Sequence, residues 1–290
     1  MMRPAAPLLR LISISVSSSL FSSCSINPST SICTSAFAAS ASQSPPSPRG
    51  ISTTTRLNMG WSDTWNDILS GGNTRWKITC DEAHKKALGH FQRYVPAPAP
   101  AGAEDDAVVS VFCPLAGDDP MVYNLWKEGY SVTTIDLVPA AVEAMRKQFQ
   151  EGSWTETVDV KGTTTIWTHD SGRATLYVGD ALQSRPELKN KFDAVYDKDS
   201  FGALNVEMRD GYCSRIAEYC KSGAKIYLEV KLKDNHEQVK DVGPPFSLKK
   251  DQLMEESNYG TNFEYVESLG SVYDITIPSA QQTGHILEKK

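Results

Sequence analysis

Short apolar runs alternate with helical patterns along most of this chain. The runs are rich in β-branched and aromatic residues, and the segments between them repeat apolar residues at helical spacing. The predicted strands are residues 107–113, 131–136, 174–178, 192–196 and 224–230, and the predicted helices between them are 121–128, 139–149 and 208–221. This alternation indicates a doubly wound α/β fold, a mostly parallel sheet covered by helices on both faces. We therefore expect a ligand site beyond the carboxyl ends of the strands.

A helical lead-in precedes the alternating part. Residues 81–94 predict a helix, and the alternating Pro and Ala of residues 96–102 indicate a surface spacer after it. We expect the folded domain to span residues 59–290, with no internal repeat and no membrane span.

Residues 1–58 have a different composition. From Met1 through Ser62 there is no Asp or Glu, but there are four Arg and many Ser, Thr, Ala and Pro. Such a stretch cannot bury enough apolar surface to offset the entropy of ordering it. We therefore expect a disordered targeting presequence that is removed, in which Arg3 and residues 4–24 resemble a weak signal-peptide core.

The destination of this presequence is indicated by residues 34–39, where small residues run into a lone Phe37. The junction resembles the bipartite presequences of algae with complex plastids, so we expect import into a plastid. The alternatives are targeting to a mitochondrion or to the secretory pathway, and a disordered tail with no targeting role. A fluorescent-protein fusion of residues 1–58 distinguishes these destinations from a diffuse cytosolic location.

The net negative charge of the chain argues against one class of partner, nucleic acids. The whole chain has a formal charge of −6, and removal of the four presequence Arg leaves 25 basic against 35 acidic residues, or −10. An acidic surface disfavours binding to a phosphate backbone. We therefore expect no nucleic acid partner. Separately, we expect a small-molecule acceptor and a monomeric protein. The six Cys include no C-x-x-C pair and the five His lack ligand spacing, so we expect no metal site.

The turn after the first predicted strand, residues 114–119, contains the first candidate ligand contacts. Gly117 permits close backbone approach, and a helix that starts at Pro120 offers free N–H groups. The turn is not G-x-G-x-x-G, and Asp118 and Asp119 would repel a pyrophosphate. This makes a nicotinamide cofactor the less favoured alternative. S-adenosylmethionine has no phosphate and carries a sulfonium and an ammonium, so it meets no such objection.

Carboxylates follow the next two strands. Asp136 ends the second strand, where it can accept hydrogen bonds from both hydroxyls of a ribose, although it could instead cap the next helix. Asp180 and Ala181 follow the third strand, in a segment that resembles the place where methyltransferases hold adenine, although Asp180 could equally be a turn residue.

The fourth strand ends in alternating charges. Lys198 can pair with the cofactor carboxylate, and Asp197 or Asp199 with its ammonium; a solvated salt-bridge cluster is the alternative. Asp199 is the one candidate base that we name. A thiol acceptor needs little activation, because with a pKa of about 8.5 it is already partly ionised at neutral pH.

An ordered set of short motifs resembles the thiopurine S-methyltransferase family. The set comprises Trp61-x-x-x-Trp65, residues 73–76 (Asn-Thr-Arg-Trp), 114–117 (Pro-Leu-Ala-Gly), 191–193 (Lys-Phe-Asp) and 243–246 (Gly-Pro-Pro-Phe). Each motif alone has modest specificity, whereas their order is that of the family. The match covers roughly residues 61–253, and the residues after 253 match poorly.

The resemblance implies a class I methyltransferase with a Rossmann-like, mostly parallel seven-stranded sheet and S-adenosylmethionine as cofactor. The implied cofactor contacts are Trp61, Trp65, Trp76, Leu115, Gly117, Asp136, Asp180, Ala181 and Lys198. The acceptor pocket is expected at Trp76, Pro245 and Phe246, since two prolines stiffen the backbone that presents Phe246. Core packing of the tryptophans and an ordinary rigid loop around Phe246 are the alternatives.

Three residues near the expected cofactor site differ from the animal enzymes of the family. Lys198 stands where the animal enzymes have Arg, and Ala116 and Asp118 stand where they have Cys and Lys; Lys keeps the charge but loses the bidentate fork. We expect methylation of a small thiol or related chalcogen by in-line displacement. Halide or hydrosulfide methylation, and a cofactor-binding module without activity, are the alternatives.

Overall fold

The strands and helices follow the order that the sequence pattern predicts, with further strands at both edges of the sheet. The computed structural model describes residues 70, 78, 80–98, 108–274 and 279–290, so the predicted presequence lies outside the described residues. The helices described are α2 (Asp81–Gln92), α3 (Pro120–Lys127), α4 (Pro139–Arg146), α5 (Val206–Tyr219), α6 (His236–Val239) and α7 (Lys250–Leu253), with short turns η2 (Pro186–Leu188), η3 (Phe201–Ala203) and η4 (Glu256–Gly260). The strands are β1 (Ser110–Pro114), β2 (Ser131–Asp136), β3 (Trp154–Val158), β4 (Thr165–His169), β5 (Ala174–Val178), β6 (Phe192–Lys198), β7 (Cys220–Lys233), β8 (Phe263–Ser271) and β9 (Ala280–Lys289). Among the helices described there, none combines the length and the apolar character that a bilayer crossing requires.

These nine strands form one sheet in the order β3-β4-β5-β2-β1-β6-β7-β9-β8. The five central strands, β5 to β7, run parallel, and the pairs at both edges are antiparallel. The seven strands from β5 to β8 correspond to the predicted seven-stranded sheet, and the β3–β4 hairpin extends it beyond β5. The strand order reverses beside β1, which places the topological switch point at the end of β1.

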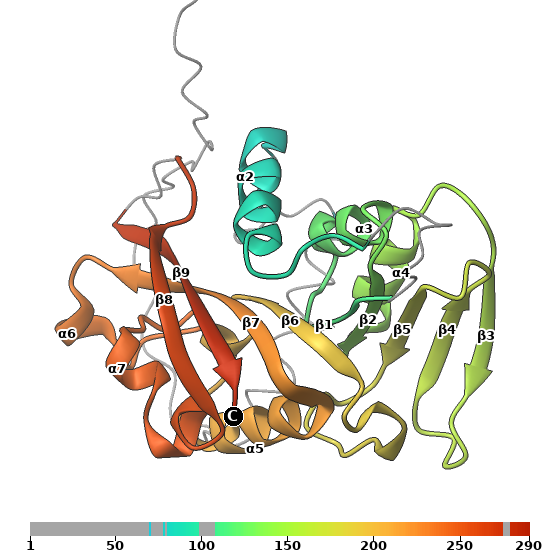
Figure 1. Cartoon of the computed structure of the whole chain (residues 1–290). Helices are drawn as coiled ribbons and strands as arrows, with labels where there is room; N and C mark the ends of the chain where they lie inside the picture. The colour runs from blue at the N-terminus through green and yellow to red at the C-terminus, as the bar shows by residue number, and fades with distance from the viewer. Residues whose placement is uncertain (1–69, 71–77, 79, 99–107, 275–278) are drawn as a thin grey trace, which may run out of the picture. The chain divides into compact units, whose positions relative to one another are not determined.

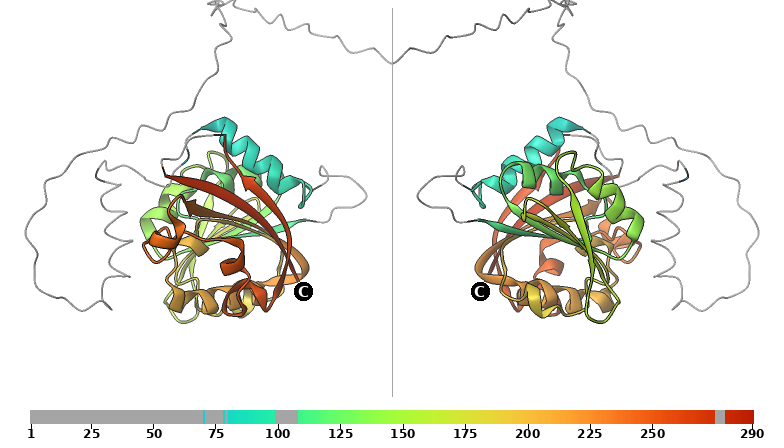
Figure 2. Two further views of the ribbon diagram at one scale, coloured as in Figure 1. Left: turned by 90° about the vertical axis from the view of Figure 1, so that its left-hand side faces the viewer. Right: turned by 90° about the vertical axis from the view of Figure 1, so that its right-hand side faces the viewer.

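Helices cover both faces of the sheet, as Figure 1 and the side views of Figure 2 show. One apolar core lies under α2, α3 and α4, which contribute the buried Phe91, Leu125 and Met145. The other core lies under α5, which contributes Tyr212 and Ile216. Each side chain of this kind stabilises the fold by about 1.5–3 kcal/mol when it is fully buried. This is the three-layer α/β arrangement that the alternation of elements predicts.

The alternation of side chains along β6 decides which residues face which core. Successive residues of a strand point to opposite faces of the sheet. Tyr196 lies in the core under α2–α4, whereas Val195 lies in the core under α5. It follows that Lys198 belongs to the α2–α4 face and Asp197 to the α5 face.

The strands that the sequence analysis did not predict lie at the edges of the sheet. In the hairpin of β3 and β4 most side chains are partly or fully exposed. Its turn is held by Asp159, which accepts hydrogen bonds from the backbone N–H groups of Thr163 and Thr164, and by Gly162 at a φ of 71°. The opposite edge ends in β9 and β8, which pair with each other and, through β9, with β7.

Candidate functional site

The turn after β1 has a strained backbone at the switch point of the sheet. Leu115 has a φ of 45° and Gly117 a φ of 57°, and the Leu115 N–H donates to the Ile135 carbonyl at 2.8 Å. A positive φ at a residue such as Leu costs free energy and is found mostly at ligand sites. The turn leads directly into α3, whose first residue is Pro120 as predicted. Both predicted contacts in this turn, Leu115 and Gly117, therefore lie at the switch point of the sheet, and their contact with a ligand stays a prediction.

Asp136 is tied to this turn by two backbone hydrogen bonds. Its Oδ2 accepts from the Gly117 N–H at 3.0 Å, and its Oδ1 accepts from the Val138 N–H at 2.9 Å. The residue is only 8% exposed, and burial raises the pKa of Asp136 to about 6 although both bonds act in the opposite direction. Each oxygen keeps a second lone pair, so the carboxylate can still accept from two ligand hydroxyls. The N-cap of α4 is Val138, so Asp136 is not the cap that the alternative predicted.

Asp180 and Ala181 follow β5 as a tight turn. Asp180 is exposed, and its Oδ1 accepts from the Leu182 N–H at 2.8 Å, so it is a turn residue as the alternative predicted. Ala181 is buried in the α5-side core. Because a carboxylate accepts several hydrogen bonds, this turn is compatible with the predicted adenine contact, which stays a prediction.

Lys198 forms a buried ion pair with Asp119. The Nζ of Lys198 lies 2.9 Å from Oδ2 of Asp119, and the two side chains are 9% and 10% exposed. The other oxygen of Asp119 caps α3 by accepting from the Met121 N–H. Burial alone would lower the pKa of Lys198, but Asp119, Glu229 and Asp199 together raise that pKa above its ordinary value. Lys198 is therefore a charged group, and its ion pair is buried rather than solvated.

The prediction that Asp197 pairs with a cofactor ammonium is wrong. Asp197 is fully buried on the α5 face, and its carboxylate accepts from the hydroxyls of Tyr212 and Tyr259 at 2.7 and 3.0 Å. The backbone N–H groups of Ser200 and Phe201 donate to it as well. The alternation of residues along the strand was the signal that could have separated Asp197 from Lys198.

Asp199 is the remaining acid beside Lys198. It has a φ of 61°, and its Oδ1 accepts from Nε2 of Gln282 at 2.9 Å. Its backbone N–H donates to the carbonyl of Glu229 at 2.9 Å, which fixes the end of β6 against β7.

Glu229 is a site residue that the sequence analysis missed. It is fully buried and pairs in register with Lys198 on the neighbouring parallel strand. Its Oε1 and Oε2 accept from the hydroxyls of Tyr227 and Tyr273 at 2.8 and 2.7 Å. An acid inside an otherwise apolar strand was the available signal, because a buried carboxylate requires partners.

The structure describes two of the three predicted acceptor residues, Pro245 and Phe246. Phe246 is half-buried, its N–H donates to the Gly202 carbonyl at 2.8 Å, and the guanidinium of Arg209 lies 5.2 Å from its ring centroid. A Cβ at Gly243 would lie 2.7 Å from the Phe246 ring, so the loop folds tightly over this ring, with the half-buried Pro245 between them in sequence. The tryptophans Trp61, Trp65 and Trp76 lie outside the described residues.

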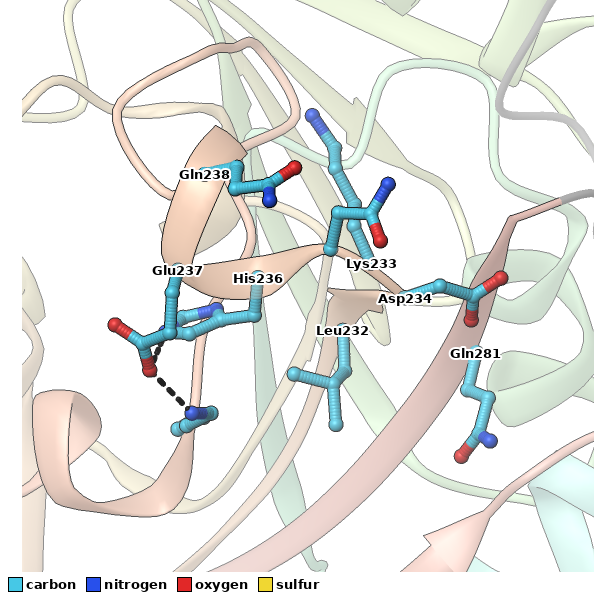
Figure 3. Close-up of a pocket in the computed structure, with 9 residues that line it drawn as sticks. Leu232, Lys233, Asp234, His236, Glu237, Gln238 and Gln281 are labelled. Atoms are coloured by element: carbon cyan, nitrogen blue, oxygen red, sulfur yellow. Dashed lines mark hydrogen bonds and ion pairs between the residues drawn. The ribbon is translucent and has the colours of Figure 1, made fainter.

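A cavity of about 430 Å³ lies at the carboxyl end of β7 (Figure 3). Glu237 at its rim lies 2.6 Å from Lys249 and 3.9 Å from His236. The residues that line it are Leu232, Lys233, Asp234, Asn235, His236, Glu237, Gln238, Lys249 and Gln281. None of the predicted cofactor or acceptor residues that the structure describes is among them.

The described cysteines have the properties of core residues. Cys80 is partly buried against the core under α2–α4, and Cys113, Cys213 and Cys220 are fully buried. Burial raises the pKa of Cys220 to about 12 and that of Cys113 and Cys213 still further. Thiols of this kind are unreactive at neutral pH. Within the part of the chain that the structure describes, no group of three or more His, Cys, Asp or Glu is arranged to hold a metal ion.

Lys198→Met is expected to destabilise the fold by about 3 kcal/mol, because Asp119 would remain buried without its counter-charge. The matched variant Lys198→Arg keeps the charge and should retain most of the stability. Urea unfolding of both variants followed by circular dichroism measures the difference. Equal free energies of unfolding for the two variants would show that the ion pair contributes nothing.

Comparison with known proteins identifies similar sequences. The family model described as thiopurine S-methyltransferase (TPMT) matches residues 61–287, so the stretch after 253, which we expected to match poorly, lies within the matched range. The chain is 31% identical over 144 residues to a thiopurine S-methyltransferase of Aliivibrio fischeri and 33% identical over 148 residues to that of Vibrio atlanticus. Both alignments cover 50% of this chain and 63% of the relative, less than two thirds of its length.

Solved structures with a similar fold are more distant in sequence. The 1,6-didemethyltoxoflavin-N1-methyltransferase of Burkholderia thailandensis, solved with S-adenosylhomocysteine, has a TM-score of 0.55 at 14% identity, covering 85% of this chain and 94% of that one. The N-methyltransferase NodS of Bradyrhizobium japonicum has a TM-score of 0.54 at 11% identity, with coverages of 79% and 97%. The [4+2]-cyclase SpnF has a TM-score of 0.56 at 14% identity, with coverages of 83% and 97%. These likenesses confirm the fold.

Proposed function

The chain belongs to the thiopurine S-methyltransferase family of S-adenosylmethionine-dependent methyltransferases, and from this premise we propose that it methylates a small thiol or related chalcogen. The observation that carries the proposal is the placement of Asp136 and Lys198. Asp136 ends β2 and Lys198 ends β6, and these two strands pair with β1 on its two sides. Both residues therefore lie at the carboxyl ends of parallel strands, beside the strained turn after β1. This is the edge at which ligands of such sheets bind.

The residues at this edge fit S-adenosylmethionine. Asp136 would accept hydrogen bonds from the ribose hydroxyls, because its backbone bonds leave one lone pair on each oxygen. Lys198 would hold the carboxylate of the methionine part, and Asp199, the next residue, is the acid that would face its ammonium. The bound cofactor supplies a methyl group that its sulfonium already activates. The protein has only to align the acceptor and exclude water.

A thiol suits this site because it needs little help from a base. It is already partly ionised near neutral pH, so positioning does most of the catalytic work. Asp199 remains the candidate base, but Gln282 donates to its Oδ1 and occupies one of its acceptor positions. We therefore propose that proximity rather than proton abstraction dominates the rate.

The alternatives differ in how well they agree with the charges at the site. A halide or hydrosulfide ion would approach Lys198 against the negative charges of Asp119, Asp199 and Glu229, which raises the free energy of an anion there. A thiol can enter this site as the neutral molecule, and its proton leaves only beside the positive charge of the sulfonium.

The test uses residues 59–290, labelled S-adenosylmethionine and a panel of small thiols, with iodide and hydrosulfide as competing acceptors. We expect labelled methyl transfer to at least one thiol. Cofactor binding without transfer to any acceptor would contradict the proposal and favour the binding module. Release of a volatile methyl halide without thiol methylation would favour the alternative enzyme.

A further inference from the structure

Glu229 and Lys198 share one face of the sheet at its carboxyl edge. Two pairs earlier in the register, Tyr196 of β6 and Tyr227 of β7 stack with ring centroids 5.4 Å apart and an interplanar angle of 6°. Both tyrosines lie in the core under α2–α4, and Phe91 of α2 packs edge-on against them. Because side chains two residues apart lie on the same face, Lys198 and Glu229 continue this row toward the candidate cofactor site.

The Glu229 carboxylate is fully buried among polar and charged groups. Two tyrosine hydroxyls donate to it, from Tyr227 and from Tyr273 after β8, and its partner on β9 is Gly284, which has no side chain. The charged groups that act on Lys198 at this position are Asp119 from the start of α3, Asp199 from the end of β6, and Glu229 itself. When all are ionised, three carboxylates face one ammonium, so the group carries a net charge of −2.

We propose that Glu229 makes the cofactor site prefer S-adenosylmethionine to S-adenosylhomocysteine by charge, an inference that rests on the proposed function. The two molecules differ by one methyl group and by the positive charge of the sulfonium. A buried negative charge that lies beyond hydrogen-bonding reach of the ligand favours the more positive of the two, because the interior screens it weakly. The substrate cofactor is thereby retained and the product is released.

The preference depends on pH. Burial raises the pKa of Glu229 to about 7, although Lys198 and both tyrosine hydroxyls act in the opposite direction. The charge is therefore present above neutral pH and lost below it, so the preference for S-adenosylmethionine grows as pH rises through 7. Binding of the positive ligand lowers the pKa of Glu229 and so releases protons. Asp136, whose pKa is about 6, also titrates, but the nucleoside part that it would contact is common to both ligands.

The experiment is calorimetry of S-adenosylmethionine and S-adenosylhomocysteine binding to the full chain at pH 6 and pH 8. The Glu229→Gln variant should reduce the preference for S-adenosylmethionine about tenfold at pH 8, the effect of roughly one pKa unit of charge interaction, and little at pH 6. It should also abolish the excess proton release that S-adenosylmethionine shows over S-adenosylhomocysteine at pH 7. The control is Glu288→Gln, which removes a carboxylate that pairs with Lys225 at the opposite end of β7 and should leave the preference unchanged.

A second variant keeps the test decisive if Glu229→Gln does not fold. Tyr273→Phe removes one donor from the carboxylate, which raises the pKa of Glu229 and should move the pH dependence of the preference upward. A preference that is the same at both pH values in the wild type and in Tyr273→Phe would overturn the inference. Failure of the wild type to bind either molecule would instead refute the proposed function.

Discussion

Asp136→Ala is expected to weaken the binding of S-adenosylmethionine at least ~100-fold. The variant loses two charged hydrogen bonds to the ribose, each contributing roughly 1.5–3 kcal/mol. It also removes the acceptor of the Gly117 N–H, so the strained turn after β1 loses one of the two hydrogen bonds described above that join it to the end of β2. The loss of affinity therefore comes both from the missing ribose hydrogen bonds and from the loosened turn after β1.

Isothermal titration of S-adenosylmethionine into wild type, Asp136→Ala and Asp136→Asn measures this effect. The Asn side chain keeps one carbonyl oxygen, so its affinity should lie between the other two. An Asp136→Ala variant that binds the cofactor within threefold of the wild type would exclude Asp136 from the cofactor site.

Asp197→Ala is expected to destabilise the fold by about 3–5 kcal/mol without any part in ligand binding. Asp197 is the common acceptor of the Tyr212 and Tyr259 hydroxyls and of two backbone N–H groups, all of which would lose this buried partner. Leaving buried donors without an acceptor costs their full desolvation free energy. The acid therefore links α5, η4 and the turn after β6.

Urea unfolding at pH 8 measures the loss, and Asp210→Ala on the exposed side of α5 is the matched control, expected to lie within about 0.5 kcal/mol of the wild type. The pH dependence gives a second readout. Burial raises the pKa of Asp197 from 3.8 to about 6, so the folded state binds this proton more tightly than the unfolded state does. Its contribution makes the wild type less stable as pH rises from about 4 to 6, and Asp197→Ala should lack that contribution. Equal stability of Asp197→Ala and the control would contradict this account.

The central part of the fold could be predicted because its strands are buried on both faces. β2 and β5 have the predicted bounds, since all their residues are buried or half-buried and many are β-branched or aromatic. The edge strands β3, β4 and β8 have many exposed side chains. Their residues give only a weak alternation of apolar and polar types, so no strands were predicted there.

The sequence predicted the site residues that stand at the ends of parallel strands, because that place in the chain determines where they lie in the fold. Asp136 and Lys198 end parallel strands, and every such end lies at the same edge of the sheet. The assignment of Asp197 failed because a shift of one residue along a strand moves a side chain to the other face. Glu229 was missed because its place beside Lys198 arises from the register of β6 and β7, which local sequence does not specify.

The most direct test of the cofactor site is a crystal structure of the chain with bound S-adenosylhomocysteine. We predict that the Asp136 carboxylate accepts hydrogen bonds from the two ribose hydroxyls and that the Lys198 ammonium contacts the carboxylate of the ligand. A nucleoside bound elsewhere, for example in the cavity beside His236, with Asp136 making only its bonds to Gly117 and Val138, would contradict the assignment of this edge as the cofactor site.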